Sequence, residues 1–200
     1  MSTRTRIAPS PTGYIHIGTL RTALFNYFLS KQKGGEFIIR IEDTDRERMV
    51  DGSVENLLNV FSRLGILNDE GPILNDFGEI QERGEVGPYV QSKRLDLYKT
   101  YVQQLLDQGD AYYCFCSKER LDEMRIAQQQ TKQTPKYDRT CTNLSEEEIE
   151  SKLLSRESHV VRMLVPEGGT VVEDLIRGTV SFNNKDVDDQ IILKSDGYPT

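Results

Sequence analysis

The sequence predicts an α/β fold built on a doubly wound, mostly parallel sheet. A strand is expected at residues 5–8, an amphipathic helix at 20–32 and an apolar strand at 37–41. A strand, a helix and a strand in this order form a right-handed crossover, and the unbroken apolar run of the second strand suits a sheet that is covered on both faces. Gly34 and Gly35 end the helix, as glycines at helix C-termini commonly do.

The turn between the first strand and the first helix predicts an anion-binding site. The helix presents one apolar face, made of Leu20, Ala23, Leu24, Tyr27 and Phe28. His16 and Gly18 therefore lie at the helix N-terminus, where backbone N–H groups and the helix dipole favour phosphate. Gly18 lacks a Cβ, so a nucleotide can approach the backbone closely. The spacing differs from the Walker loop and from the G-x-G-x-x-G motif.

The remaining elements follow from the same kind of patterning. Apolar residues at helical spacing predict helices that include residues 54–61, 95–106, 121–124 and 149–153. Ser117 can cap the third of these, and Ser145 with Glu148 forms a capping box before the fourth. Residues 66–91 hold several glycines and prolines and predict an irregular connection. Late in the chain, strands are expected at 160–165, 171–176, 179–182 and 191–193, the middle two as a hairpin.

This change of pattern suggests an insertion within a nucleotide-binding sheet. We expect residues 1–85 to form the first half of that domain, 86–188 an α+β insertion, and 189–200 the start of the second half. The net charge of −7 argues mildly against a nucleic-acid partner. However, residues 1–41 carry six Lys or Arg against one Glu, which gives +5 and leaves −12 elsewhere. A local basic region can therefore bind phosphate even though the protein as a whole is acidic.

The sequence also indicates the compartment. The N-terminus is polar and resembles no signal peptide, and no apolar run approaches the length of a membrane span. Three cysteines, an odd number, argue against a secreted disulfide framework. We therefore expect a cytoplasmic protein without a membrane partner.

Several separate motifs resemble those of class I aminoacyl-tRNA synthetases. The HIGH loop of bacterial-type glutamyl-tRNA synthetases is similar to the string Arg6-Ile7-Ala8-Pro9-Ser10-Pro11-Thr12-Gly13-Tyr14-Ile15-His16-Ile17-Gly18-Thr19. Thr19 takes the place of the last His of the signature, a variation common in that family. The similarity continues through residues 20–27, 40–48, 87–89, 177–178 and 194–200. It thus covers nearly the whole chain.

The resemblance implies a Rossmann-like class I synthetase catalytic domain interrupted by an acceptor-stem-binding insertion. It implies ATP-dependent ligation of L-glutamate to tRNA(Glu) through a glutamyl-adenylate, with Mg²⁺, by a monomer. The sequence ends inside a family motif and holds no K-M-S-K-S-like loop, so we expect it to be the N-terminal part of the enzyme and to be inactive when isolated. There are three other interpretations. A glutaminyl enzyme is disfavoured by the Pro-Ser-Pro-Thr string. A glutamyl-queuosine tRNA synthetase and a non-catalytic zinc- and tRNA-binding module stay open.

The resemblance also assigns residues to roles. The catalytic set is His16, Gly18 and Thr19, and the ATP-binding set is Thr12, Gly13, His16 and Gly18. The glutamate-binding set is Arg6, Ala8, Ser10 and Glu42, and the tRNA-binding set is Asp45 and Arg48. From residue chemistry alone, Arg offers a bidentate fork to a carboxylate and Glu an anion to an ammonium group. There are three alternatives without a ligand. They are an Arg6–Glu42 ion pair, a surface His16, and a solvated cluster of Asp43, Asp45, Arg46 and Arg48.

The three cysteines suggest a metal site. Zinc favours thiolates in tetrahedral coordination, and Cys114, Cys116 and Cys141 fall in one subdomain. Some relatives in the resembling family bind zinc here, with a varying fourth ligand. A His that sometimes lies two positions beyond the last Cys is Asn143 in this sequence, so Tyr137 is our choice, with water or a carboxylate as alternatives. Free buried thiols without metal remain the competing interpretation.

Overall fold

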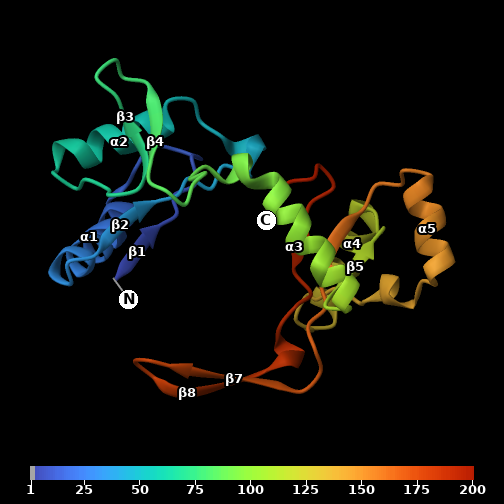
Figure 1. The fold of residues 1–200 in the computed structure, drawn as a ribbon. Helices are drawn as coiled ribbons and strands as arrows, with labels where there is room; N and C mark the ends of the chain where they lie inside the picture. The colour runs from blue at the N-terminus through green and yellow to red at the C-terminus, as the bar shows by residue number, and fades with distance from the viewer. Residues whose placement is uncertain (1–2) are drawn as a thin grey trace. The chain divides into compact units, whose positions relative to one another are not determined.

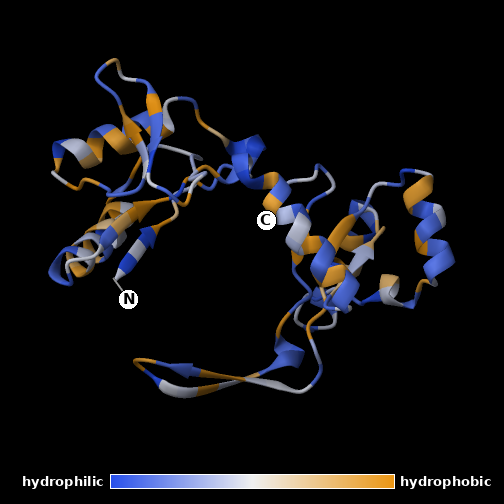
Figure 2. Ribbon diagram, viewed as in Figure 1, coloured by the Kyte–Doolittle hydropathy of each residue, from blue (hydrophilic) through white to orange (hydrophobic). Residues whose placement is uncertain are grey.

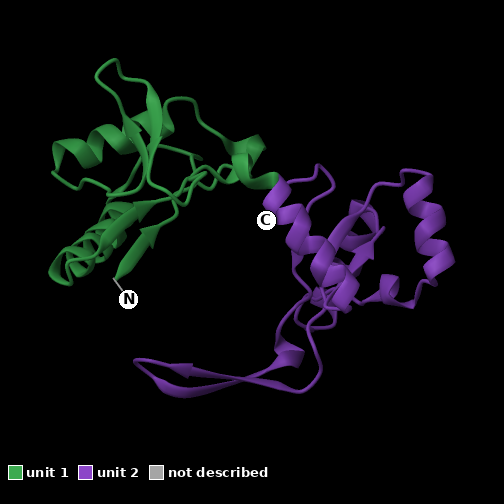
Figure 3. Cartoon of the chain, viewed as in Figure 1, with its two compact units in different colours: residues 1–95 green, residues 96–200 purple. Residues whose placement is uncertain are grey.

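The computed structural model describes residues 3–200, and the chain divides into two compact units, Met1–Leu95 and Asp96–Thr200 (Figure 3). Figure 1 shows their helices and strands in chain order. Each unit has its own hydrophobic core. The predicted boundaries of the insertion, after residues 85 and 188, stay a prediction.

The first unit is built on the predicted strand–helix–strand crossover. Strand β1 (Arg4–Ile7) pairs in parallel with β2 (Glu36–Ile39), and α1 (Ile17–Gln32) connects them (Figure 1). Thr5 and Ile7 are buried, whereas Arg6 between them is exposed on the opposite side of the strand. The register of β1 and β2 confirms the predicted parallel pair, and the alternation of burial places Arg6 outside the core. The core residues are Ile7, Ala23, Phe37, Ile39, Ile41, Leu57, Leu58, Phe61 and Ile66.

Helix α1 differs from its prediction in two ways. It begins at Ile17, three residues earlier than expected, because His16 is its N-cap. Ala23 is buried and Leu20, Leu24 and Tyr27 pack against the core, but Phe28 is 62% exposed. The apolar face is therefore narrower than the sequence suggested. The Phe28 ring lies edge-on to the Tyr27 ring, at 5.8 Å between centroids.

The segment predicted to be irregular contains a β-hairpin. Strands β3 (Gly71–Leu74) and β4 (Ile80–Arg83) pair antiparallel after α2 (Ser53–Arg63). Gly71 has a φ of 115°, and a Cβ there would lie 2.2 Å from the Ile39 carbonyl oxygen. The glycine that suggested a loop is thus the residue that lets β3 approach β2. Two short 3-10 helices, Arg46–Arg48 and Gln91–Arg94, complete the unit.

The second unit is built on a three-stranded antiparallel sheet. Its strands lie in the order β5 (Ala111–Cys114), β6 (Val160–Met163) and β9 (Ile191–Leu193). Strand β5 was not predicted. The helices are α3 (Leu95–Gln108), α4 (Lys118–Gln130) and α5 (Glu146–Leu154), with 3-10 helices at Thr140–Asn143 and Asn184–Asp186. Ser117 caps α4, and the Ser145–Glu148 capping box begins α5, as predicted.

The expected late hairpin is present as β7 (Gly169–Asp174) and β8 (Gly178–Asn183). Most of its residues are exposed, and Leu175 and Ile176 at its tip are fully so. In Figure 2 this tip is coloured as hydrophobic. Among residues 3–200, no helix has both the length and the apolar character that crossing a membrane requires.

Candidate active site

The turn before α1 holds its histidine in a defined orientation. His16 has extended backbone angles, and its Nδ1 accepts a hydrogen bond from the Gly18 N–H at 3.1 Å. On the other side of the ring, Nε2 lies 3.4 Å from Thr19 Oγ1. Because Nδ1 acts as the acceptor, the neutral ring carries its proton on Nε2. The imidazole therefore caps the helix with one nitrogen and keeps the other as a hydrogen-bond donor.

Gly18 is fitted closely against this ring. A Cβ at Gly18 would lie 2.9 Å from His16 Cε1 and 3.0 Å from Nδ1, closer than normal contacts. Thr22 Oγ1 donates to the Gly18 carbonyl at 3.2 Å, which fixes the first helical turn further. From the sequence, glycine was expected at this position so that a ligand could approach the backbone. The structure adds a second reason, which is the approach of the His16 side chain itself.

A cavity of about 180 Å³ opens beside this turn. Of the residues that the sequence assigned to sites, it brings together Ser10, Thr12, Gly13, His16 and Thr19. Arg6, Ala8, Gly18 and Glu42 do not line it. The lining also includes four residues that the sequence did not indicate, which are Ile41 and the α2 residues Ser53, Val54 and Leu57. Ser53 Oγ donates to the Pro11 carbonyl at 3.2 Å and so ties α2 to the turn.

The Arg6 and Glu42 side chains meet, but neither lines the cavity beside His16. Arg6 Nη1 donates to Glu42 Oε1 at 3.1 Å, although the two residues are far apart in sequence. Arg40 Nη2 donates to the same oxygen at 2.7 Å, a partner that the sequence analysis did not identify. The Glu42 N–H donates to the Pro9 carbonyl at 3.0 Å, which extends the parallel ladder beyond β2 and brings the two side chains to one sheet edge. These side chains are partly exposed, so a ligand can reach them.

The acidic segment after β2 contains two kinds of carboxylate. Asp43 accepts from the Ser92 N–H at 2.8 Å and from Ser92 Oγ at 2.6 Å, so it anchors the start of the second 3-10 helix. Asp45 accepts from Arg48 Nε at 2.7 Å and caps the short helix of residues 46–48. The Arg48 side chain is 76% exposed. Asp43 is thus structural, whereas Asp45 and Arg48 present a paired, accessible surface.

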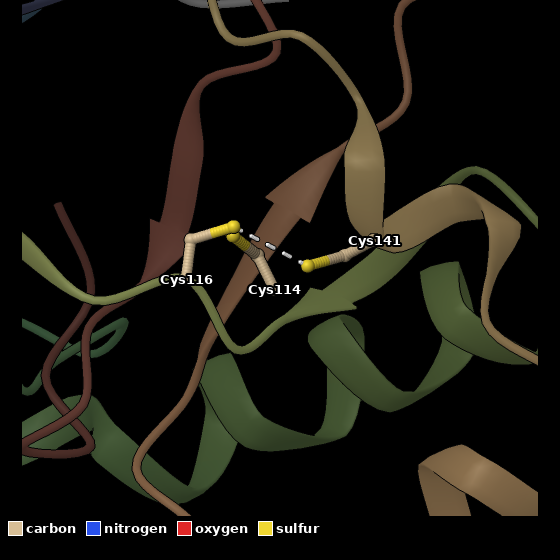
Figure 4. A group of neighbouring side chains, drawn as sticks. All are labelled: Cys114, Cys116 and Cys141. Carbon is tan, nitrogen blue, oxygen red and sulfur yellow. Dashed lines mark hydrogen bonds between the residues drawn. The ribbon is translucent and has the colours of Figure 1, made fainter. Parts of the chain in front are cut away.

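The three cysteines form one cluster in the second unit. Their sulfur atoms all lie within 4.8 Å of one another, and Cys116 and Cys141 are 3.5 Å apart (Figure 4). The buried Tyr137 hydroxyl lies 3.2 Å from Cys116 Sγ and accepts from the Cys141 N–H at 3.2 Å. The predicted set of four residues therefore meets at one point.

The surroundings of the thiols shift their pKa values in opposite directions. Burial raises the pKa of Cys116 to about 11, and the neighbouring Cys141 and Cys114 add to this effect. Burial would also raise the pKa of Cys114, but hydrogen bonds from Tyr137 and Arg162 lower it below its usual value. The buried Arg162 guanidinium stacks 4.2 Å from the Tyr137 ring centroid. The thiolate form is therefore more favoured at Cys114 than at Cys116.

A buried carboxylate fixes the loop that carries Tyr137 and Cys141. Asp189 accepts from Arg139 through both oxygens, at 2.7 and 2.8 Å. It also accepts from Tyr112 Oη at 2.8 Å and from the Val165 N–H at 3.0 Å. Arg139 has a φ of 60°, unusual for a residue with a side chain. The ion pair stabilises this conformation and holds the loop against the sheet.

The fold, the capped His16 turn and the ion pair at the sheet edge define a class I aminoacyl-tRNA synthetase catalytic domain. The family described as "tRNA synthetases class I (E and Q), catalytic domain" matches residues 2–200, and the chain belongs to this family.

Individual relatives agree with this assignment. All of this chain aligns with a glutamate--tRNA ligase of Clostridioides difficile at 53% identity, and 98% of this chain aligns with that of Finegoldia magna at 48% identity. It spans 41% of the length of each of these proteins. A crystal structure of a glutamate tRNA ligase from Elizabethkingia meningosepticum in complex with its amino acid matches with a TM-score of 0.88 and 37% identity. That match covers all of this chain and 40% of the other.

Proposed function

We propose that this chain supplies the ATP- and glutamate-binding half of a glutamate--tRNA ligase. In this reaction the α-carboxylate of glutamate attacks the α-phosphorus of ATP and releases pyrophosphate. The glutamyl group then passes from the adenylate to a hydroxyl of the terminal adenosine of tRNA(Glu), and AMP leaves. The observation that carries the proposal is that the capped His16 turn and the Arg6–Glu42 pair lie on one sheet edge in a chain of this family.

The turn before α1 is the proposed ATP site. Thr12, Gly13 and His16 border the cavity, and Gly18 sets the ring orientation. The His16 Nε2–H faces Thr19 Oγ1 and can donate instead to a phosphate oxygen, while the N-terminus of α1 adds its dipole. Donors fixed in this way stabilise charge that develops on the phosphates without reorganising. Mg²⁺ would accompany ATP and neutralise part of the same charge.

The ion pair at the end of β1 is the proposed glutamate site. The Arg6 guanidinium can bind the side-chain carboxylate of the substrate, and Glu42 its ammonium group. Arg40 holds Glu42 in place. Ala8 and Ser10 follow Arg6 along the same segment and complete the proposed pocket. A substrate that carries both charges can replace the Arg6–Glu42 contact with two contacts of its own.

The proposal extends to tRNA, zinc and compartment. Asp45 and Arg48 present an accessible pair near the sheet edge, which we assign to the terminal adenosine of tRNA.

A zinc ion with Zn–S distances of about 2.3 Å needs sulfurs about 3.8 Å apart, a spacing that the thiol cluster can reach with small shifts. Cys114, Cys116, Cys141 and Tyr137 would hold it, and it would join β5 to the 137–141 loop. We further propose that the protein is cytoplasmic and that it is a monomer. Light scattering can test the oligomeric state.

The test is glutamate-dependent exchange of pyrophosphate into ATP, with tRNA present, by a protein of the relatives' length that carries these residues. Exchange that requires glutamate supports the proposal. Its absence, with tRNA still bound, would favour the non-catalytic tRNA-binding module. The insertion of an acceptor-stem-binding domain is tested separately, by footprinting of tRNA against variants of the second unit.

A further inference from the structure

Arg120 connects two parts of the thiol cluster. It lies in the first turn of α4, and its Nη1 donates to Cys116 Sγ at 3.4 Å. Its Nη2 donates to Asp138 Oδ2 at 2.6 Å and to Thr140 Oγ1 at 2.7 Å. One guanidinium thus reaches the sulfur of one cysteine and two residues of the segment that leads to Cys141.

The neighbouring contacts make this connection rigid. Cys116 directly precedes Ser117, the N-cap of α4, so the position of its sulfur is linked to the helix start. On the other side, Asp138 accepts from the Thr140 N–H at 3.2 Å and from Thr140 Oγ1 at 2.8 Å. The planar fork of Arg120 can hold both sides at once, which the single point charge of a lysine cannot do.

The charge of a filled site gives Arg120 a second effect. A divalent ion with three thiolates has a net charge of −1, and Cys114 and Cys141 are buried. An N–H donor on a thiolate sulfur stabilises that charge. Loss of a group that orients or hydrogen-bonds a metal ligand typically costs about 10- to 100-fold in metal affinity or activity.

We propose that Arg120 is the positioning residue of the metal site, holding Cys116 and the 138–141 segment in the arrangement that binds zinc. This inference rests on the zinc site proposed above, and not on the aminoacylation activity. Arg120 touches the ligands and does not coordinate the ion. Its removal is expected to weaken zinc binding while all four candidate ligands remain.

The experiment compares the 200-residue chain with three variants, Arg120→Gln, Arg120→Lys and Arg125→Gln. Arg125 is the matched control, because it lies on the same helix in an exposed ion pair with Asp122. Zinc affinity is measured by competition with a chromophoric chelator. We expect the affinity of Arg120→Gln to fall about 10- to 100-fold, as for loss of a hydrogen bond to a metal ligand. The zinc affinity of Arg120→Lys should lie between those of Arg120→Gln and the parent chain, and the affinity of Arg125→Gln should equal that of the parent.

Cobalt provides a readout that a purely structural role would not change. In the Co²⁺-loaded protein, loss of the hydrogen bond to Cys116 should move the sulfur-to-cobalt charge-transfer absorption to lower energy, since the thiolate becomes a better donor. Thermal unfolding of the metal-free proteins should differ little. A large loss of metal-free stability without a spectral shift would mean that Arg120 only packs the loop, and would overturn the proposal.

The remaining outcomes are also decisive. If the parent chain binds no zinc, both the metal site and the role of Arg120 fall, whatever the enzyme activity. If the parent binds zinc and Arg120→Gln binds it as tightly as Arg125→Gln, the zinc site stands and the role of Arg120 is wrong. Neither readout uses aminoacylation, so a failure here is distinct from a failure of the proposed function.

Discussion

Replacing Gly18 with Ala should separate catalysis from stability. The added Cβ would lie 2.9 Å from His16 Cε1, so the imidazole must move by several tenths of an ångström. The ring then loses its 3.1 Å hydrogen bond from the Gly18 N–H. A hydrogen bond of this kind contributes about 1 kcal/mol to stability, and Ala gains about 1 kcal/mol over Gly inside a helix. The free energy of unfolding should therefore change little.

The effect on activity should be much larger. A displacement of about 1 Å at a reacting centre can lower a rate about 100-fold, so a smaller shift of the ring predicts a loss of about 10- to 100-fold in glutamate-dependent pyrophosphate exchange. Exchange kinetics and thermal unfolding of the same preparation provide the two measurements. Gly18→Ala activity within twofold of the parent would refute the assignment of the ring to the ATP site.

Gly34→Ala is the matched control for this substitution. Gly34 lies at the other end of α1 with a φ of 61°, and a Cβ added there would meet no atom within 4 Å. Alanine in this left-handed conformation costs about 1 kcal/mol. The control should therefore lose a few degrees of melting temperature and keep its exchange activity, the opposite of the result for Gly18→Ala.

Three further predictions concern the sheet edge and the second unit. Glu42→Gln should raise the KM for glutamate at least tenfold in exchange assays while changing stability by less than about 1 kcal/mol, because its ion pairs are partly exposed; an unchanged KM would remove Glu42 from the substrate site. Asp189→Asn should lower the free energy of unfolding by about 3 kcal/mol in urea titrations, since it leaves Arg139 without its buried partner; a loss below about 1 kcal/mol would contradict this. Burial raises the pKa of Asp189, but hydrogen bonds from Arg139 and Tyr112 hold it below 3.8. The contribution of Asp189 to the free energy of unfolding is therefore present above about pH 4 and is lost as the pH falls through the lower folded-state pKa. Acid unfolding that is identical in Asp189→Asn would argue against this linkage.

The sequence was most informative where local chemistry decides the structure. The strand–helix–strand unit, the Ser145–Glu148 capping box and the late hairpin all depend on near neighbours, and the structure has them. The convergence of Arg6 and Glu42 was also predictable, because the carboxyl ends of adjacent parallel strands meet at one edge. Their binding roles, like those of the ATP and tRNA residues, stay predictions.

The features that escaped prediction depend on contacts between distant residues. Gly71 and Pro72 suggested a loop, yet Gly71 belongs to β3 because it allows a close approach to Ile39. Strand β5 is short and gains its partner only from β6, which follows much later in the chain. Periodicity carries no information on such contacts. Arg40 is a different case, because it lies two residues before Glu42 in an extended segment, where alternation places both side chains on one face. The sequence could therefore have indicated this pair.

The most direct measurement is amino-acid-dependent pyrophosphate exchange, with tRNA present, by a protein of the relatives' length that carries these residues. Our account predicts exchange with glutamate, little with glutamine, and a large loss with Arg6→Gln, because Arg6 would bind the side-chain carboxylate that glutamine lacks. Equal exchange with glutamine and glutamate, or full glutamate-dependent exchange in Arg6→Gln, would contradict it.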